Sequence, residues 1–113
     1  TMRQRSVRAA SLKLLSNPAD FDFPVREEYF LSDNTSIGRA DDNTIVIKDR
    51  QMSKHQAVIV QNGGHFLIDD LKATNPTQVN DEVVTQPVEL HSRDMVALGG
   101  IHFVFLNEAD HEN

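Results

Sequence analysis

The sequence predicts an all-β fold, a sandwich or barrel of many short strands. Short apolar stretches recur along the chain, and turn-forming residues separate them. The pair Asn62-Gly63 lies between the apolar stretches 57–60 and 65–69. It is a strong signal for a hairpin, because both residues accept a positive φ angle. Phe103 and Phe105 recur at a spacing of two, which is typical of a strand that buries one face.

The predicted strands follow one another along the whole chain. The first is expected near residues 10–16, where polarity alternates over 11–14, although a helix over 5–15 without an N-cap residue competes with it. The stretch 16–23 contains Asn17-Pro18 and two aspartates, which favours a loop. Further strands are predicted at 28–31, 35–38, 44–47, 57–60, 65–69, 88–90, 95–98 and 101–106.

Turn residues account for the breaks between these strands, and periodicity identifies part of the core. Val96 and Leu98 are spaced like Phe103 and Phe105, so all four side chains are expected in the core. The predicted turns are Asp33-Asn34, Asp41-Asp42-Asn43, Asn75-Pro76, Asn80-Asp81 and Gly99-Gly100.

Length and composition are those of one ordinary domain. The chain has 113 residues, enough to bury a hydrophobic core without the help of disulfides or metals, and it has no cysteine. The absence of cysteine excludes disulfides, thiolate metal sites and a cysteine nucleophile, and it fits a reducing compartment. No apolar run approaches the roughly 20 residues that span a bilayer, and no secretory signal is recognisable. We therefore expect a cytoplasmic location.

Charge is unevenly distributed along the chain. The net charge is −6, from 11 basic and 17 acidic residues. Residues 1–13 contain four basic residues and no acid, so residues 14–113 contain seven basic and 17 acidic residues. An acidic body repels polyphosphates, so we expect no nucleic-acid binding, although a local basic pocket can still bind a single phosphate.

These patterns divide the chain into three parts. Residues 1–10 are expected to form a flexible basic tail, residues 11–107 the domain, and residues 108–113 a flexible acidic tail. Basic segments of this kind flank membrane spans. Contact with a membrane is therefore expected only through a flanking segment outside this sequence.

Four short motifs follow one another, and together they resemble the forkhead-associated (FHA) domain. That family's pattern is Gly-Arg, then Ser-Arg/Lys-x-His-Ala, then Asp-Leu-x-Ser-x-Asn-Gly-Thr-x-Val-Asn-Gly, then Asp-x-Ile-x-Leu-Gly. The resemblance implies an FHA-like (SMAD/FHA) β-sandwich of about eleven strands whose loops at one end bind phosphothreonine peptides. The matching motifs are Ile37-Gly38-Arg39, residues 53–57 (SKHQA), residues 70–80 (DLKATNPTQVN) and residues 94–99 (DMVALG).

The resemblance also assigns ligand contacts, and the chemistry of the side chains agrees. Arginine offers a planar fork for two phosphate oxygens, serine a hydroxyl donor, and lysine a charge. Threonine can donate through its hydroxyl or its amide, and asparagine suits a peptide main chain because it has both a donor and an acceptor. The assigned residues are Arg39, Ser53, Lys54, Thr74 and Asn75.

The chain departs from the family pattern at three positions near this site. Gln56 replaces the histidine that braces the loop, and it can supply a donor and an acceptor instead. Ala73 replaces a serine. Pro76 replaces a glycine, which fixes φ near −65° and removes an N–H. We expect the turn around Pro76 to keep its register, because the matches on both sides keep their spacing.

The predicted function is a phosphothreonine-peptide-binding signalling or adaptor module that recognises a phosphorylated protein partner downstream of a Ser/Thr kinase. No catalytic residue, metal or cofactor is expected. The charges of Lys48, Arg50 and Lys72 are interpreted as ordinary surface charges, and Asp70 and Leu71 as residues that set the turn.

Two alternatives stay open. The first is an FHA-like scaffold that mediates phosphorylation-independent protein–protein assembly, motivated by the three departures. The second is a hydrolase that uses Ser53, His55 and an aspartate. It is less favoured, because Lys54 and His55 point different ways on an extended chain and Ser53 is not in a nucleophile elbow.

Overall fold

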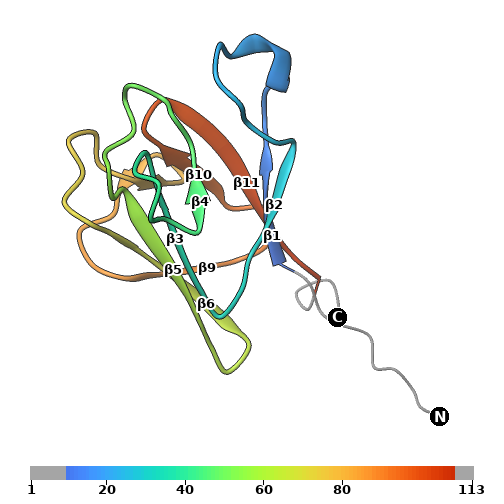
Figure 1. Ribbon diagram of the computed structural model, residues 1–113. Helices are drawn as coiled ribbons and strands as arrows, with labels where there is room; N and C mark the ends of the chain where they lie inside the picture. The colour runs from blue at the N-terminus through green and yellow to red at the C-terminus, as the bar shows by residue number, and fades with distance from the viewer. Residues whose placement is uncertain (1–9, 109–113) are drawn as a thin grey trace.

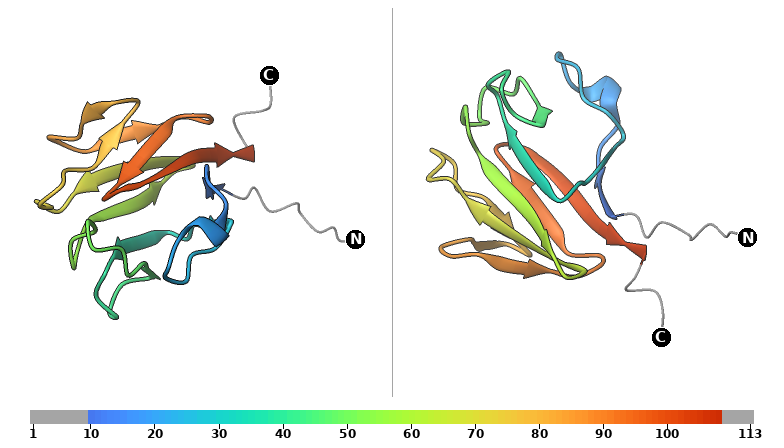
Figure 2. Two further views of the ribbon diagram at one scale, coloured as in Figure 1. Left: turned by 90° about the horizontal axis from the view of Figure 1, so that it is seen from above. Right: turned by 60° about the horizontal axis from the view of Figure 1, so that its bottom comes forward.

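The computed structural model describes residues 10–108, which form two β-sheets packed face to face (Figures 1 and 2). The six-stranded sheet has the order β2-β1-β11-β10-β7-β8, and the five-stranded sheet has the order β4-β3-β5-β6-β9. The six-stranded sheet consists of β1 (Ala10–Leu14), β2 (Glu28–Phe30), β7 (Gln78–Val79), β8 (Glu82–Val83), β10 (Met95–Leu98) and β11 (Ile101–Asn107). The five-stranded sheet consists of β3 (Asn34–Gly38), β4 (Ile45–Val46), β5 (Ala57–Asn62), β6 (His65–Asp70) and β9 (Val88–Leu90). The predicted all-β sandwich of eleven strands is confirmed.

The core lies between the sheets and consists of side chains that alternate along the strands. Val96, Leu98, Phe103 and Phe105 are all fully buried, so the core prediction from their spacing is confirmed. Phe105 of β11 meets Phe66 of β6 across the core, with ring centroids 5.6 Å apart. Contacts of this kind fix the distance between the sheets, so the loops at each end start from rigid strands.

The hairpin at residue 62 forms, but its turn is shifted by one residue from the expected place. Asn62 still belongs to β5, where it pairs with His65 of β6. The residues with positive φ are Gly63 (60°) and Gly64 (87°). A two-residue turn of this hand needs positive φ at both central positions, and two glycines adopt it at a lower cost than Asn-Gly.

A second short hairpin follows the motif at residues 70–80. The predicted turn Asn80-Asp81 is confirmed, because both residues have positive φ, 52° and 71°. It joins β7 to β8, two-residue strands that the apolar pattern alone did not predict. Strands this short carry too few residues for a periodicity of two to be visible in the sequence.

The segment before β2 differs slightly from expectation. The expected loop at 16–23 contains a short 3-10 helix, Pro18–Asp20, whose first turn Asn17 caps. Ala10 is buried and belongs to β1. Residues 1–9 and 109–113 of the expected tails lie outside the described residues. Within the described part of the chain, no helix is long and apolar enough to cross a membrane.

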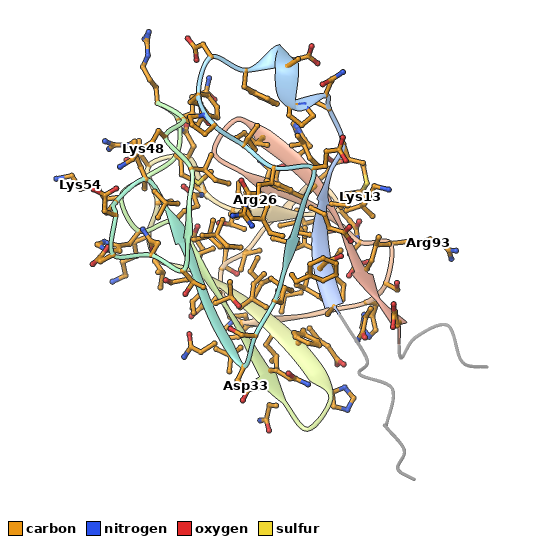
Figure 3. All side chains as sticks on the ribbon, turned by 45° about the vertical axis from the view of Figure 1, so that its right-hand side comes forward. Lys13, Arg26, Asp33, Lys48, Lys54 and Arg93 are labelled. Atoms are coloured by element: carbon orange, nitrogen blue, oxygen red, sulfur yellow. The ribbon has the colours of Figure 1, made fainter. Side chains whose placement is uncertain are left out.

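The segments that carry the motifs meet at one end of the sandwich. Residues 39–56 lead from β3 through β4 to β5, and residues 71–77 lead from β6 to β7. Figure 3 shows Lys48 and Lys54 toward one end of the sandwich, whereas Asp33, in the β2–β3 turn, lies toward the opposite end.

Candidate functional site

An open groove of about 440 Å³ lies between the 39–54 segment and the 71–75 loop. All five residues that the sequence assigned to ligand binding line this one groove, although they come from three separate stretches of the chain. No carboxylate is among the lining residues, which are Arg39, Arg50, Gln51, Met52, Ser53, Lys54, His55, Leu71, Thr74 and Asn75.

The Gly38-Arg39 pair places the arginine at the floor of the groove. The Arg39 N–H donates to the Ser53 carbonyl at 2.9 Å, and the next N–H, of Ala40, donates to the Lys54 carbonyl at 3.1 Å. A Cβ on Gly38 would lie only 2.1 Å from that Lys54 oxygen. Glycine is therefore required for the two segments to approach this closely, and the approach orients Arg39.

The Arg39 guanidinium is held at one end and free at the other. Its Nε donates to the Met52 carbonyl at 2.9 Å, and the side chain is half-buried. Its two terminal nitrogens have no hydrogen-bond or ion-pair partner among residues 10–108. An arginine fixed through Nε presents these nitrogens as a fork that matches two oxygens of a phosphate.

Ser53 links the two loops through its hydroxyl oxygen and can still donate its hydroxyl hydrogen. Its Oγ accepts a hydrogen bond from the Thr74 N–H at 2.9 Å, so its own hydroxyl hydrogen stays available to an anion. The same bond uses the Thr74 amide, which was one of two donors expected from that residue. The Thr74 hydroxyl is the donor that remains.

Gln56 braces both loops from beneath the groove. It is fully buried, its Oε1 accepts from the Ser53 N–H at 3.0 Å, and its Nε2 donates to the Asn75 carbonyl at 2.8 Å. The same Nε2 lies 3.2 Å from the hydroxyl of buried Thr77. The expectation that glutamine can brace the loop in place of histidine is confirmed.

The loop that contains Pro76 is tied at both ends. One Asp70 carboxylate oxygen accepts from the Ala73 N–H at 3.1 Å, and the other accepts from the Thr77 N–H at 2.9 Å. The loop residue with positive φ is Lys72 (61°), not Pro76. Proline therefore occupies its position without strain in φ, and the loop keeps the register that the flanking motif predicts.

Asn75 stands at the rim of the groove with its side chain partly used. Its Nδ2 donates to the Gln51 carbonyl at 3.0 Å, which joins the tip of the 71–77 loop to the 39–54 segment. Its Oδ1 has no partner among residues 10–108. In this conformation the free oxygen is an acceptor for a peptide N–H.

Two basic side chains beside the groove, Lys48 and His55, are paired with aspartates. Lys48 Nζ lies 2.7 Å from Asp41 Oδ1 and also donates to the Arg39 carbonyl at 2.8 Å. The hydrogen bond and charge of Lys48 hold the pKa of the Asp41 carboxyl below its usual value. His55 Nε2 lies 3.0 Å from Asp42 Oδ1. The other cations that line the groove are Arg39, Arg50 and Lys54, and no carboxylate of residues 10–108 forms an ion pair with them.

The prediction missed five of the residues that line the groove: Arg50, Gln51, Met52, His55 and Leu71. Arg50 was interpreted as an ordinary surface charge, yet it lines the groove. Leu71 was expected only to set the turn, yet its side chain is 39% exposed and also lines the groove. The abundance of basic residues between 39 and 54 was the only signal in the sequence, and it did not distinguish Arg50 from Lys48.

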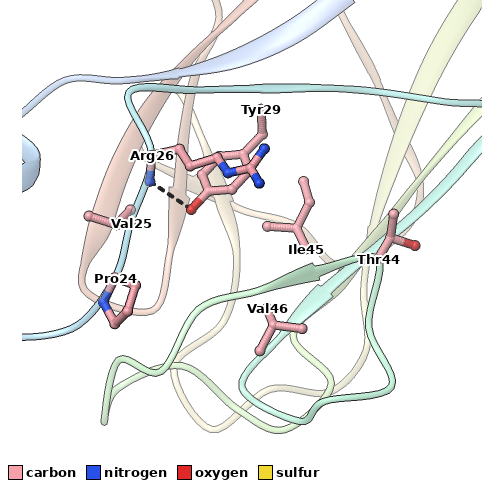
Figure 4. Close-up of a pocket in the computed structure, with 7 residues that line it drawn as sticks. All are labelled: Pro24, Val25, Arg26, Tyr29, Thr44, Ile45 and Val46. Atoms are coloured by element: carbon pink, nitrogen blue, oxygen red, sulfur yellow. Dashed lines mark hydrogen bonds between the residues drawn. The ribbon is translucent and has the colours of Figure 1, made fainter.

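A second groove, of about 420 Å³, lies at the open side of the sandwich, between the edge strands β2 and β4 (Figure 4). Aliphatic side chains and Tyr29 make up most of its wall, and the Tyr29 hydroxyl accepts from the Arg26 N–H at 2.9 Å. The lining residues are Pro24, Val25, Arg26, Tyr29, Thr44, Ile45 and Val46. No group of three or more metal-binding side chains occurs in residues 10–108.

Comparison with known protein families matches residues 35–99 to the FHA domain. The chain belongs to the FHA domain family. The match begins within β3, extends through β10 and includes the Gly38-Arg39 pair and both loops of the groove.

The curated relatives that match this chain include a transcriptional regulatory protein and an ABC transporter of Mycobacterium tuberculosis. The transcriptional regulatory protein EmbR of Mycobacterium tuberculosis is 37% identical over 71 residues, which are 63% of this chain and 18% of EmbR. The ABC transporter ATP-binding/permease protein Rv1747 of the same organism is 42% identical over 69 residues, 61% of this chain and 8% of the transporter. The chain thus spans less than a fifth of the length of these relatives.

Solved structures of FHA domains superpose closely. EmbR of Mycobacterium tuberculosis, solved in complex with a low-affinity phosphopeptide, matches with a TM-score of 0.75 and 31% identity over 87% of this chain and 24% of that one. An FHA domain from a study of phosphothreonine-dependent FHA interactions matches with a TM-score of 0.75 and 27% identity, over 87% of this chain and 95% of that domain.

Proposed function

We propose that this chain is a phosphothreonine-peptide-binding module. Arg39, Ser53 and Lys54 hold the phosphate, Thr74 adds a hydroxyl donor beside it, and Asn75 binds the peptide main chain. The observation that carries the proposal is the groove itself. It combines a half-buried arginine with free terminal nitrogens, a serine hydroxyl and a lysine, and it has no carboxylate, on a chain whose net charge is −6. A phosphate dianion is the ligand that such a set of donors fits best.

The relatives support the same conclusion. EmbR was solved in complex with a low-affinity phosphopeptide, and an FHA domain was solved in a study of phosphothreonine-dependent FHA interactions. The ligand of this chain is then a phosphorylated protein partner, marked by a Ser/Thr kinase, and not a nucleic acid, which the acidic body would repel. Binding of this kind takes place where kinases act, so we place the module in the cytoplasm. The module carries no catalytic role of its own.

The three departures from the family pattern leave the groove assembled. Gln56 makes the bracing hydrogen bonds, and Asp70 ties the Pro76 loop at both ends. These contacts weaken the main argument for the alternative hypothesis, a scaffold that binds its partners independently of phosphorylation. For the hydrolase alternative, Ser53 Oγ bonds to Thr74 and His55 bonds to Asp42, and no hydrogen bond joins Ser53 to His55 in residues 10–108.

Titration of matched threonine, phosphoserine and phosphothreonine peptide libraries against the domain, by fluorescence anisotropy, tests the proposal. Phosphothreonine peptides are expected to bind at least tenfold more tightly than their threonine counterparts, because each charge-assisted hydrogen bond contributes about 1.5–3 kcal/mol. Phosphoserine peptides are expected to bind about fourfold more weakly, because one buried methyl group is worth about 0.8 kcal/mol. Equal binding of threonine and phosphothreonine peptides would replace this proposal with the scaffold alternative.

A further inference from the structure

The outward face of the six-stranded sheet carries more apolar side chains than a solvent-exposed sheet face usually does. Its outward positions alternate with the buried core residues of β1, β10 and β11. Such positions are commonly polar in an antiparallel sheet with one solvated face. Here Phe30 is 67% exposed and Met95 is 44% exposed. The residues of this outer-face patch are Phe30, Met95, Ala97, Val104 and Leu106.

The strand register joins these residues into one patch. Met95 of β10 is opposite Val104 of β11. Leu106 of β11 and Phe30 of β2 are both opposite Ser11 of β1, on its two sides. Side chains that are directly opposite on one face lie about 4.5–5.5 Å apart, measured between Cβ atoms. The outer-face patch therefore extends across the sheet from β2 to β10.

The outer face of the five-stranded sheet has the polarity expected of a solvated face. Asn34 and Ser36 lie at outward positions of β3, and Glu89 Oε2 of β9 lies 2.6 Å from His65 Nδ1 of β6. Val60 of β5 is an exposed hydrophobic residue on that face, at 37%. The outer-face patch differs because several apolar side chains adjoin one another, and burial of such a patch against a partner is favourable.

Charge favours a second copy of the chain as that partner. The net charge of −6 makes two copies repel each other in most orientations. With His102 neutral, the outward positions of the six-stranded sheet hold two formal charges, Lys13 and Glu28, which are opposite each other in the register and cancel. The Ser11 hydroxyl also donates to Glu28 Oε2 at 2.6 Å. A second copy can therefore approach this face without like-charge repulsion.

We infer that the outer-face patch is a self-association surface, on which the six-stranded sheets of two copies pack face to face about a two-fold axis. A two-fold interface uses the same surface on both copies, so that surface must be complementary to itself. Two sheets of the same twist meet this need, because they pack with their strands about 30° apart and with about 10 Å between the sheets. Side chains such as Met95 and Val104 then fill the space between the two copies.

The size of the face sets the strength of the dimer. Six strands about 4.8 Å apart span about 24 Å, and the seven residues of β11 span about 23 Å. The face thus offers roughly 500 Å² per copy, or roughly 1,000 Å² for the pair, near the lower limit of specific interfaces. We therefore expect a weak, reversible dimer. No residue of the patch lines the groove between the loops, so self-association leaves that groove open.

Sedimentation velocity of the 113-residue chain, from micromolar to millimolar concentration, measures this association. Met95→Glu and Phe30→Glu each place a carboxylate in the patch, on two different strands. Val60→Glu is the matched control, because it adds the same charge to an exposed apolar strand position on the outer face of the other sheet. Circular dichroism verifies that the variants are folded, and NMR spectra of the wild type on dilution identify the amides that shift.

The average mass of the wild type is expected to rise with concentration from one chain toward two, and the amides that shift on dilution should belong to β1, β10 and β11. Each patch variant should raise the dimer dissociation constant at least roughly tenfold, because an unpaired carboxylate on each copy would be buried against apolar side chains. Val60→Glu should change that constant by less than about twofold, since its charge stays in solvent.

A wild type that stays monomeric over the whole concentration range overturns the inference, and the patch would then have a different partner. A dimer that the patch variants leave intact, or that Val60→Glu weakens as much as they do, also overturns it. None of these outcomes bears on the proposed function, because phosphopeptide binding is measured at the other groove.

Discussion

Two of the open grooves in residues 10–108 are nearly equal in size but have very different walls. The groove between the loops, about 440 Å³, presents three unpaired cations, a serine hydroxyl and a partly free amide side chain. The groove between β2 and β4, about 420 Å³, presents mainly aliphatic side chains, one arginine and a tyrosine whose hydroxyl accepts a hydrogen bond from the Arg26 backbone N–H. Volume does not distinguish the two. The number of cations does, since Arg39, Arg50 and Lys54 line the groove between the loops and only Arg26 lines the other.

The two grooves also have different origins. The one between β2 and β4 lies where the two sheets end without a neighbouring strand, so the side chains at the margin of the core become its wall (Figure 4). The Tyr29 ring is one of these, 6.3 Å from Phe103 between ring centroids. The groove between the loops is held open by polar contacts between distant segments. A buried polar brace of this kind stabilises one arrangement of the loops only if all its partners are satisfied.

The largest expected effect is on stability, and it concerns the side chains that hold each groove together. Gln56→Ala removes the side chain that hydrogen-bonds to both loops. The Ser53 N–H, the Asn75 carbonyl and the buried Thr77 hydroxyl then lose these hydrogen bonds. The free energy of unfolding is expected to fall by about 3 kcal/mol, because each unsatisfied buried group costs about 1–3 kcal/mol. Tyr29→Phe, which removes one hydrogen bond beside the other groove, should cost about 1 kcal/mol. Urea denaturation measures both values, and equal losses would contradict the role of Gln56 as a brace.

The next largest effect concerns phosphate binding. Arg39→Ala is expected to weaken phosphothreonine-peptide binding by at least tenfold, because it removes charge-assisted hydrogen bonds worth about 1.5–3 kcal/mol each. Arg26→Ala, the same change in the other groove, should leave affinity unchanged. Calorimetric titration gives both affinities, and circular dichroism verifies that both variants are folded. A weak effect of Arg39→Ala in a folded protein would show that phosphate is held elsewhere.

A smaller effect is expected at the rim of the groove between the loops. Asn75→Ala loses the hydrogen bond to the Gln51 carbonyl and the free Oδ1, so peptide binding should weaken by about 1 kcal/mol, or roughly fivefold. Competition with a fluorescent phosphopeptide measures the change. If affinity stays at the wild-type value, the Asn75 side chain serves only to join the two loops.

Pro76→Gly, which restores the family residue, should change affinity by less than about twofold. The loop is tied by Asp70 and Gln56 in either case, and the proline lowers only the conformational freedom that the loop loses on binding. Competition with the fluorescent phosphopeptide measures this change in affinity as well. Much tighter binding by the glycine variant would show that proline holds the loop away from its binding conformation.

The smallest effect is electrostatic. Lys48 lowers the pKa of Asp41 in the folded chain below the reference value of 3.8. A lowered folded-state pKa stabilises the fold above the unfolded pKa, and this contribution is lost as the pH falls through the folded value. Stability of the wild type should therefore decrease slightly faster than that of Asp41→Asn below about pH 4. Urea midpoints between pH 3 and pH 7 measure the difference, and parallel curves would contradict it.

The sequence predicted strands where the local pattern was long enough to read. The strands at 88–90 and 95–98 have the predicted boundaries, and the Asn80-Asp81 turn lies where expected. The motif at 37–39 also predicted that Arg39 belongs to the groove. The glycine at position 38 is required there, because only glycine tolerates the close approach of the Lys54 carbonyl. Alternation, turn preference and steric need for glycine are properties of a few neighbouring residues, so they are visible without the fold.

By itself, then, the sequence determined the all-β class, the order of most strands, the core residues of β10 and β11, and five of the polar residues that line the groove between the loops. Tertiary structure decided how these residues are used. Gln56 meets Asn75 and Thr77 from 19 and 21 positions away, and Asn75 meets Gln51 from 24 positions away. Which cations stay unpaired was decided in the same way, since Lys48 and Arg50 look alike in sequence but only Lys48 reaches Asp41. Hydrogen bonds and ion pairs act over about 3–4 Å, so their partners depend on where separate loops meet in space, which no local pattern encodes.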